Sequence, residues 1–341
     1  MIRALRVSAA AACVQLLACG TTGLEAAPAR PGGESLAPQP SPMRPGEVTA
    51  HPAPLALLED ENPVLAANKR LVFDMWRSIV NAGHVELADT MLQEFYIQHS
   101  PILPTGRAAF KAIFSAIPRR DIPAVVSPSL VTILGEGDLV VMALREELPE
   151  PSGQGSYSTV HFNLFRVEDR RLAEHWHSVQ DAPGANVLPP DQGGPQRVTG
   201  LSGPAQLKLL EDADPRLAAN KRLVFDAWRQ FPNADKRHLT GTYFAPDFIE
   251  HDPDAAAGAR LAAEVRAVPP AQPYLQDPVV AMVAQGDLVV LVTAREHPHP
   301  ARPGETYTTT WFDMFRIADG KIAEHWNCAI KPGTPQPKYG D

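Results

Sequence analysis

The feature of this sequence that most limits its fold is a segment that occurs twice. Leu65–Asp74 reads LAANKRLVFD, and the same residues recur as Leu217–Asp226, each followed after one residue by Trp-Arg. Further matches follow in the same order: Gly137–Val141 with Gly286–Val290, Phe165-Arg166 with Phe315-Arg316, and Glu174–Trp176 with Glu324–Trp326. The offset is 152 residues at Leu65 and 150 at Glu174. Such regular spacing predicts one domain present twice, each copy long enough for its own core.

Proline-rich stretches surround the two copies. The chain has 35 prolines in 341 residues, and many of them lie before, between and after the repeated blocks. Segments of that composition bury too little apolar surface to fold alone, so we predict extended spacers. The predicted organisation is a signal peptide at 1–18, a tether at 19–58, a first domain at 59–181, a linker at 182–210, a second domain at 211–331 and a tail at 332–341.

The N-terminal residues predict export. Arg3 and Arg6 precede a short apolar stretch, which is typical of a secretory signal rather than of a spanning helix. The stretch ends in LLACG, which resembles a bacterial lipobox, in which Cys19 becomes the first residue and carries lipid. An ordinary signal cleaved elsewhere is the alternative. We expect a lipoprotein of the cell envelope, held at a membrane by its N-terminal lipid anchor.

Composition excludes two broad classes. The net charge is −8 and no basic face is evident, which argues against a nucleic-acid partner. No uninterrupted apolar run approaches the roughly 20 residues of a membrane span. We therefore expect no nucleic-acid partner, and contact with a membrane only through the N-terminal lipid.

In each copy, the sequence pattern predicts helices first and strands afterwards. In the first copy, Asn62-Pro63 is a favourable helix start, followed by an apolar stripe with helical spacing and a stop at Gly83. Further helices are predicted at 85–92 and 106–117, and strands at 129–134, 138–148, 156–167 and 172–179. This order is typical of an α+β fold. We predict a curved antiparallel sheet wrapped around the N-terminal helices, present twice.

Several strings resemble the SnoaL-like, polyketide cyclase-like family of the nuclear transport factor 2-like superfamily. They are FYIQHSP at Phe95–Pro101, the Gly-Asp-Leu-Val-Val turn and the closing Glu-His-Trp. The resemblance covers about 59–181 and 211–331. It implies a cone-shaped fold around a mostly apolar pocket, with cofactor-independent acid/base chemistry on a carbon acid. Many relatives have an aspartate directly after His-Trp, but His177 and Asn327 occupy that position here, which weakens the transfer of cyclase activity.

Alternation along the last two strands of each copy supplies candidate site residues, although the sequence does not decide which face points inward. The predicted catalytic residues are His99, His177, Asn163 and Asp313. The predicted ligand-binding residues are Gln98, His161, His175, His251, His325 and Asn327. His99 and His251 match between the copies and suit either a pocket or structural support of a strand end. Glu174 and Glu324 are expected to pair with Arg166 and Arg316, and Trp76 and Trp228 to lie in the cores.

The function predicted from these residues is binding of a small apolar carbonyl or polycyclic compound. Isomerase, aldol or lyase chemistry without a cofactor would then depend on the histidines, whose imidazoles titrate in the useful range. No Cys pair, His-Glu-x-x-His or glycine-rich phosphate loop is present, so we predict neither a metal nor a cofactor. The alternative is a non-catalytic envelope module whose copies pack as an intrachain pseudo-dimer.

Overall fold

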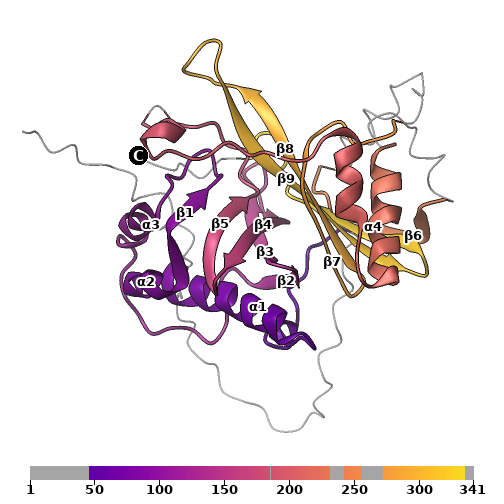
Figure 1. Ribbon diagram of the computed structural model, residues 1–341, viewed down its shortest axis with the longest axis horizontal. Coiled ribbons are helices and arrows are strands. Elements are labelled where there is room, and N and C mark those ends of the chain that lie inside the picture. The colour runs from indigo at the N-terminus through magenta and orange to yellow at the C-terminus, as the bar shows by residue number, and fades with distance from the viewer. Residues whose placement is uncertain (1–45, 185, 231–241, 255–271, 335–341) are drawn as a thin grey trace, which may run out of the picture.

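The computed structural model describes residues 46–184, 186–230, 242–254 and 272–334, which form two halves (Figure 1). The predicted signal peptide, Cys19, most of the predicted tether and most of the tail lie outside these residues. Within them, no helix is both long and apolar enough to cross a membrane.

The helices of the first half begin where the sequence predicts. Helix α1, Pro63–Met75, has Asn62 as its N-cap, whose Oδ1 accepts a hydrogen bond from the backbone N–H of Val64 at 2.9 Å. The helix continues as a π-helix, η3, and the chain then turns at Gly83, whose φ of 71° favours glycine. The helical elements that follow are η3 Trp76–Val80, η4 Val85–Leu87, α2 Ala88–Met91 and α3 Arg107–Phe114.

Five strands form the first sheet in the order β1-β5-β4-β3-β2. They are β1 Leu92–Gln98, β2 Leu130–Glu136, β3 Leu139–Pro149, β4 Ser156–Glu168 and β5 Arg171–His177. Strand β1 pairs parallel to β5, whereas the other pairs are antiparallel. The expectation of an antiparallel sheet is therefore wrong for one pair: β1 comes first in the chain, and β5, the last strand of the meander β2–β5, lies beside it and runs in the same direction.

The second half has the same strand order, β6-β10-β9-β8-β7, again with one parallel pair. The described residues thus form two five-stranded mixed sheets with few helices. The elements of this half, with the helical segments that precede it, are η5 Pro190–Gln192, η6 Gly203–Leu210, α4 Pro215–Trp228, β6 Phe244–Glu250, β7 Val279–Gln285, β8 Leu288–Pro298, β9 Thr306–Ala318 and β10 Lys321–Asn327.

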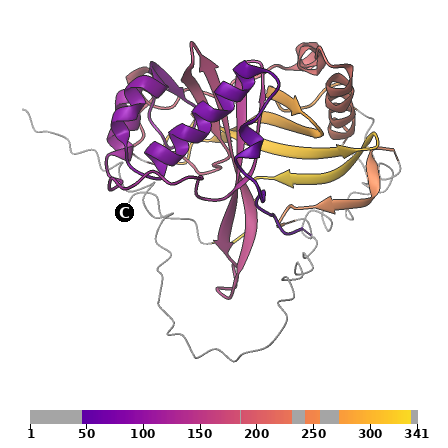
Figure 2. The same ribbon diagram turned by 90° about the horizontal axis from the view of Figure 1, so that it is seen from below.

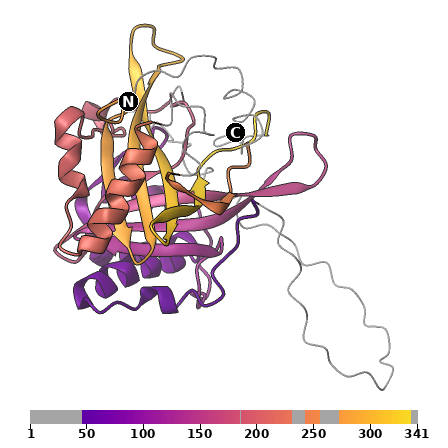
Figure 3. The same cartoon turned by 90° about the vertical axis from the view of Figure 1, so that its right-hand side faces the viewer.

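The two sheets pack against each other, and helices lie on their opposite faces (Figure 2, Figure 3). Apolar side chains from both sheets form one shared core, in which the rings of Phe162 and Phe312 stack with centroids 5.4 Å apart. A separate core lies between each sheet and its own helices, as where Phe73 and Ile79 pack with Met142. The molecule therefore has three apolar layers, and each sheet is buried on both faces.

Polar contacts at the sheet interface are reciprocal. At the end of β2, Glu136 accepts from the backbone N–H of Ala284 at 2.7 Å and pairs with the buried Lys221 of the other half. At the matching end of β7, Gln285 accepts from the N–H of Gly135 at 3.0 Å and donates to Asp60. Each half thus completes hydrogen bonds of the other.

The segments that precede the two halves are packed in matching ways. The backbone N–H of Val48 donates to Ser158 at 3.0 Å, and that of Val198 donates to Thr308 at 2.8 Å. Both valines are buried in the shared core. Residues 46–58 and 196–210, which composition assigned to the tether and the linker, are therefore docked on the sheets.

Candidate functional site

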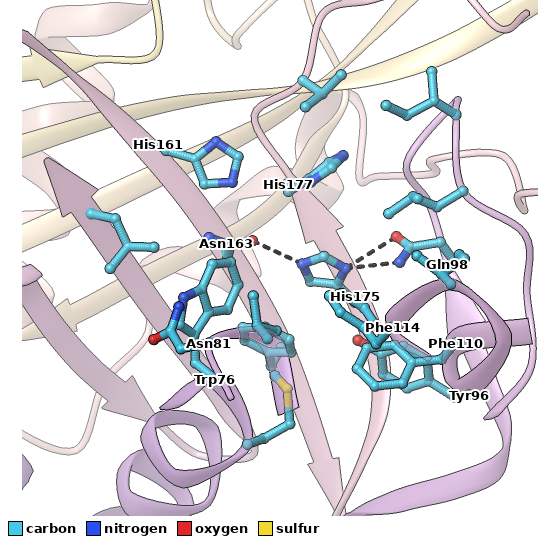
Figure 4. A pocket seen from close by; sticks show the side chains of 18 of the residues that line it. Trp76, Asn81, Tyr96, Gln98, Phe110, Phe114, His161, Asn163, His175 and His177 are labelled. Atoms are coloured by element: carbon cyan, nitrogen blue, oxygen red, sulfur yellow. Dashed lines mark hydrogen bonds between the residues drawn. The ribbon is translucent and has the colours of Figure 1, made fainter. Parts of the chain in front are cut away.

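A cavity of about 120 Å³ lies between the first sheet and its helices (Figure 4). Its walls are mostly apolar and come from α1, η3, α3, β1 and strands β3 to β5. The polar side chains that line it are few, and most come from neighbouring positions on β1, β4 and β5: Gln98, His161, Asn163, His175 and His177. A concave apolar site with convergent polar groups is the usual form of a small-molecule pocket.

The structure shows which face of each strand points into the cavity. His161, Asn163 and Phe165 alternate along β4 and line the cavity, whereas Val160 and Phe162 point into the shared core. On β5, His175 and His177 face the cavity. Glu174, which precedes His175 on β5, binds Arg166 at 2.9 Å, as expected, and Glu324 likewise binds Arg316.

A chain of hydrogen bonds runs along the wall through Gln98, His175 and Asn163. Gln98 Oε1 accepts from the backbone N–H of Ser100 at 3.0 Å. Both side-chain atoms of Gln98 lie beside His175 Nδ1, Nε2 at 3.0 Å and Oε1 at 3.1 Å. His175 Nε2 lies 3.0 Å from Asn163 Oδ1. The amide nitrogen of Asn163, a residue only 1% exposed, has no hydrogen-bond partner within the described part of the chain.

The imidazoles of the cavity are neutral at physiological pH. Burial lowers the pKa of His175 to about 3, with His161 and His99 adding to the effect. Burial also lowers the pKa of His177 well below its ordinary value, with His175 contributing. Neutral rings can accept protons or hydrogen bonds from a ligand, although their basicity is reduced.

His177 and His161 lie on the side of the cavity opposite its helices. His177 Nε2 is 2.5 Å from Ser100 Oγ, and its ring centroid is 5.7 Å from that of His161. His161 Nδ1 lies 4.0 Å from Glu146, and burial lowers the pKa of His161 while Glu146 opposes that shift. Asn163 neighbours His161 and, like Glu146, tends to raise its pKa, but the amide nitrogen of Asn163 meets no acceptor there in hydrogen-bond geometry.

A second cavity, of about 320 Å³, shares Glu146, His161 and Val179 with the first. Its other walls include Asp181 and the segment after β10, represented by Cys328, Ile330 and Thr334. That segment is held on the first half by its own hydrogen bonds, among them Tyr157 Oη to Thr334 Oγ1 at 2.7 Å. The second half therefore supplies one wall of a space that adjoins the first-half cavity.

His99 and His251 lie outside the lining of the first-half cavity. The ring of His99 stacks on Trp176 at 4.7 Å, binds Glu174 at 2.6 Å and lies 3.1 Å from the carbonyl oxygen of Arg197. His251 repeats this arrangement with Trp326, Glu324 and the carbonyl of Glu47. Both histidines thus attach the segment preceding the opposite half to a strand end, and His99 is absent from the lining of the first-half cavity.

In the second half, His325 is the counterpart of His175, and its neighbours are charged. His325 Nδ1 lies 2.8 Å from Glu250 and its Nε2 lies 3.0 Å from Asp313. Burial alone would lower the pKa of His325, but the two carboxylates raise it to about 9. Asn327 donates to Asp252 at 3.0 Å. Asp313 and His325 therefore form an ion pair, and Asn327 takes the place of His177.

The sequence missed several residues that line the first-half cavity or contact its lining. Ser100 and Glu146, which contact His177 and His161, follow or lie within strands without any repeat or motif to mark them. Trp76 was expected in the core, but it lines the cavity and donates from Nε1 to the carbonyl of Ser127 at 3.2 Å. Asn81 donates to the same carbonyl at 2.6 Å. Among the described residues, no group of His, Cys, Asp and Glu side chains is arranged to hold a metal ion.

Comparison with known families gives one match. Residues 224–325 match the model of the SnoaL-like domain. The matched region is the second half, so the resemblance of the first half to the SnoaL-like domain stays a prediction. No curated protein matches the chain significantly.

Several solved structures are similar to parts of this chain. A proposed SnoaL-like polyketide cyclase from Jannaschia sp. CCS1 is 21% identical over 35% of this chain and 89% of its own, with a TM-score of 0.25. An LEH-like epoxide hydrolase of M. tuberculosis is 13% identical over 34% and 84%, also at 0.25. AclR, a proposed hydroxylase from Streptomyces galilaeus, is 22% identical over 32% and 74%, at 0.23.

Proposed function

We propose that the chain is a tandem duplication of a SnoaL-like domain, with copies at 59–181 and 211–331. The repeated sequence blocks and the shared strand order support this proposal. The reciprocal contacts of Glu136 and Gln285 support it further, because they relate the halves as two subunits of a symmetric dimer would be related. We infer that the halves form an intrachain pseudo-dimer.

The function that the site supports best is binding of a small, largely apolar carbonyl compound, polycyclic ones included, in the first half. The observation that carries this proposal is the amide nitrogen of Asn163, which is buried, unpartnered and part of the cavity wall. A buried polar group without a partner costs about 1–3 kcal/mol, which a ligand's carbonyl oxygen would recover by accepting its hydrogen bond. The apolar walls would bury the remainder of the ligand.

Acid/base chemistry on that ligand would involve Asn163 and His177. A carbonyl that accepts from Asn163 is polarised, which makes a proton on the adjacent carbon more acidic. His177 is unprotonated at neutral pH and could take that proton, with the electrons passing to the carbonyl oxygen as an enolate. Returning the proton to another carbon is an isomerisation, and attack of the enolate on a second carbonyl is an aldol-type reaction.

A non-catalytic binding module is the second candidate, and two observations favour it. The carboxylate that many relatives place after His-Trp is absent in both halves, and the strong lowering of the pKa of His177 reduces its strength as a base. The second half, in which His325 is engaged by two carboxylates, would serve as a structural partner.

Ligand capture tests binding and chemistry separately. The mature chain is isolated, its bound compound is identified by native mass spectrometry, and the complex is then incubated in heavy water. We expect the wild type to retain a carbonyl compound and to place deuterium on the carbon next to the carbonyl. His177→Gln should retain the compound without exchange, and Asn327→Gln is the matched control in the second half. Retention with no exchange in the wild type would establish the binding module instead.

We also propose that Cys19 carries lipid and anchors the protein to a membrane of the cell envelope. The support is the LLACG string after a short apolar segment. Metabolic labelling with a fatty-acid analogue should mark the wild type and not Cys19→Ser. Equal labelling of both would contradict the anchor.

A further inference from the structure

The two halves carry the same histidine in opposite surroundings. His175 and His325 occupy the same position of the closing strand, each beside a residue of the preceding strand and one at the end of the parallel strand. In the first half these neighbours are the amides of Asn163 and Gln98. In the second half they are the carboxylates of Asp313 and Glu250. The substitutions conserve shape but exchange a donor and an acceptor for acceptors alone.

In the first half this difference fixes the direction of every hydrogen bond. A neutral ring carries one proton, and Asn163 Oδ1 can only accept, so that proton lies on His175 Nε2. His175 Nδ1 must then accept; Gln98 Nε2 at 3.0 Å and Gln98 Oε1 at 3.1 Å both lie beside it, and of these two atoms only Nε2 can donate. The backbone N–H of Ser100 holds Gln98 Oε1 on the other side at 3.0 Å. Asn163 Nδ2 is therefore the last donor in this series of hydrogen bonds.

In the second half, the two ring nitrogens of His325 cannot be divided into one donor and one acceptor. Both ring nitrogens of His325 face carboxylate oxygens, at 2.8 and 3.0 Å, so both must carry protons. Asp313, the counterpart of Asn163, has no side-chain N–H that could donate to a ligand. The second half therefore lacks the donor that the first half has at the matching place.

We propose that Gln98 and His175 are positioning residues that hold the side-chain nitrogen of Asn163 toward the cavity as a hydrogen-bond donor. We further infer that this arrangement restricts binding of a ligand with a hydrogen-bond acceptor to the first half. The inference deepens the proposed function and rests on it for the ligand class. It explains why two copies of one fold retain the same histidine but not the same neighbours.

Nitrogen NMR of isotope-labelled histidine in the ligand-free mature chain tests the relay. The expected signal for His175, assigned by its loss in His175→Gln, is the neutral Nε2–H tautomer. In Gln98→Glu/Asn163→Asp, which copies the second half, the ring should be doubly protonated at neutral pH. In Glu250→Gln/Asp313→Asn, the His325 ring should become neutral. A neutral Nδ1–H tautomer at His175 would overturn the proposal, as would a ring that stays neutral in the first double variant.

Infrared spectroscopy of bound cyclohexanone tests the donor itself. We expect its carbonyl stretch to move to lower frequency in the wild type, and Asn163→Asp to weaken its binding about tenfold or more and abolish the movement. Gln154→Glu, on an exposed turn, adds the same charge and should change neither. If the Nε2–H tautomer is found but cyclohexanone does not bind, the relay stands and the proposed ligand class fails. If cyclohexanone binds equally to Asn163→Asp, the role of the donor is refuted.

Discussion

The ion pair of His325 predicts that the second half loses stability as the pH becomes alkaline. The pKa of the folded state, about 9, lies above the ordinary value of 6.5 because Glu250 and Asp313 outweigh the effect of burial. A group whose pKa is raised on folding stabilises the protein fully below its unfolded pKa, and this contribution disappears as the pH rises through its folded pKa. The contribution of His325 should therefore be complete below about pH 6.5 and lost near and above pH 9.

The size of this effect follows from the shift. At about 1.4 kcal/mol per pKa unit, the change from 6.5 to about 9 corresponds to roughly 3 kcal/mol. Denaturation in urea would be measured for the wild type and His325→Gln from neutral to alkaline pH. We expect the stability difference between the two proteins to shrink by roughly this amount over that range.

His175→Gln is the matched control in the first half. The pKa of His175, about 3, is lowered from 6.5 by burial, so its contribution is present above pH 6.5 and is lost as the pH falls toward 3. The stability difference between His175→Gln and the wild type should therefore stay constant from neutral to alkaline pH, the range in which the difference for His325→Gln shrinks. If both differences change alike in alkaline solution, the assignment of opposite charge states to the two histidines is refuted.

Two further predictions concern the interface between the sheets. Phe162→Ala should cost about 3–5 kcal/mol, because Phe162 is fully buried and stacks on Phe312; a loss below about 1 kcal/mol in urea denaturation would contradict a shared core. Burial raises the pKa of the Cys328 thiol to about 12, so an aromatic disulfide reagent at mildly alkaline pH should modify it only after unfolding, and rapid modification of the native protein would be the contrary result.

Local sequence predicted much of the secondary structure. The helix start at Asn62-Pro63 was predictable because a side-chain cap followed by proline needs no distant partner. The strands of the meander were predictable because their alternation and turns are local. The pairing of Glu174 with Arg166 follows from the same locality, since β4 and β5 are consecutive and antiparallel.

The features that the sequence left open depend on distant contacts. The parallel pairing of β1 with β5 joins Gln98 to His175, and nothing in the local sequence specifies that partner. The position of His99 depends on the carbonyl of Arg197, a residue of the segment between the halves. The inward face of β4 became evident only when Phe162 was seen to pack on the opposite sheet. Some residues of the site, such as His175 and His177, were therefore predictable, but their arrangement was not.

A crystal structure of the mature chain with its captured ligand tests the central claim most directly. The account predicts a carbonyl oxygen within hydrogen-bond distance of Asn163 Nδ2, with the apolar part of the ligand between the first sheet and its helices and His177 beside the carbon next to the carbonyl. A ligand bound only in the second half, or one that presents a donor to Asn163, would contradict it.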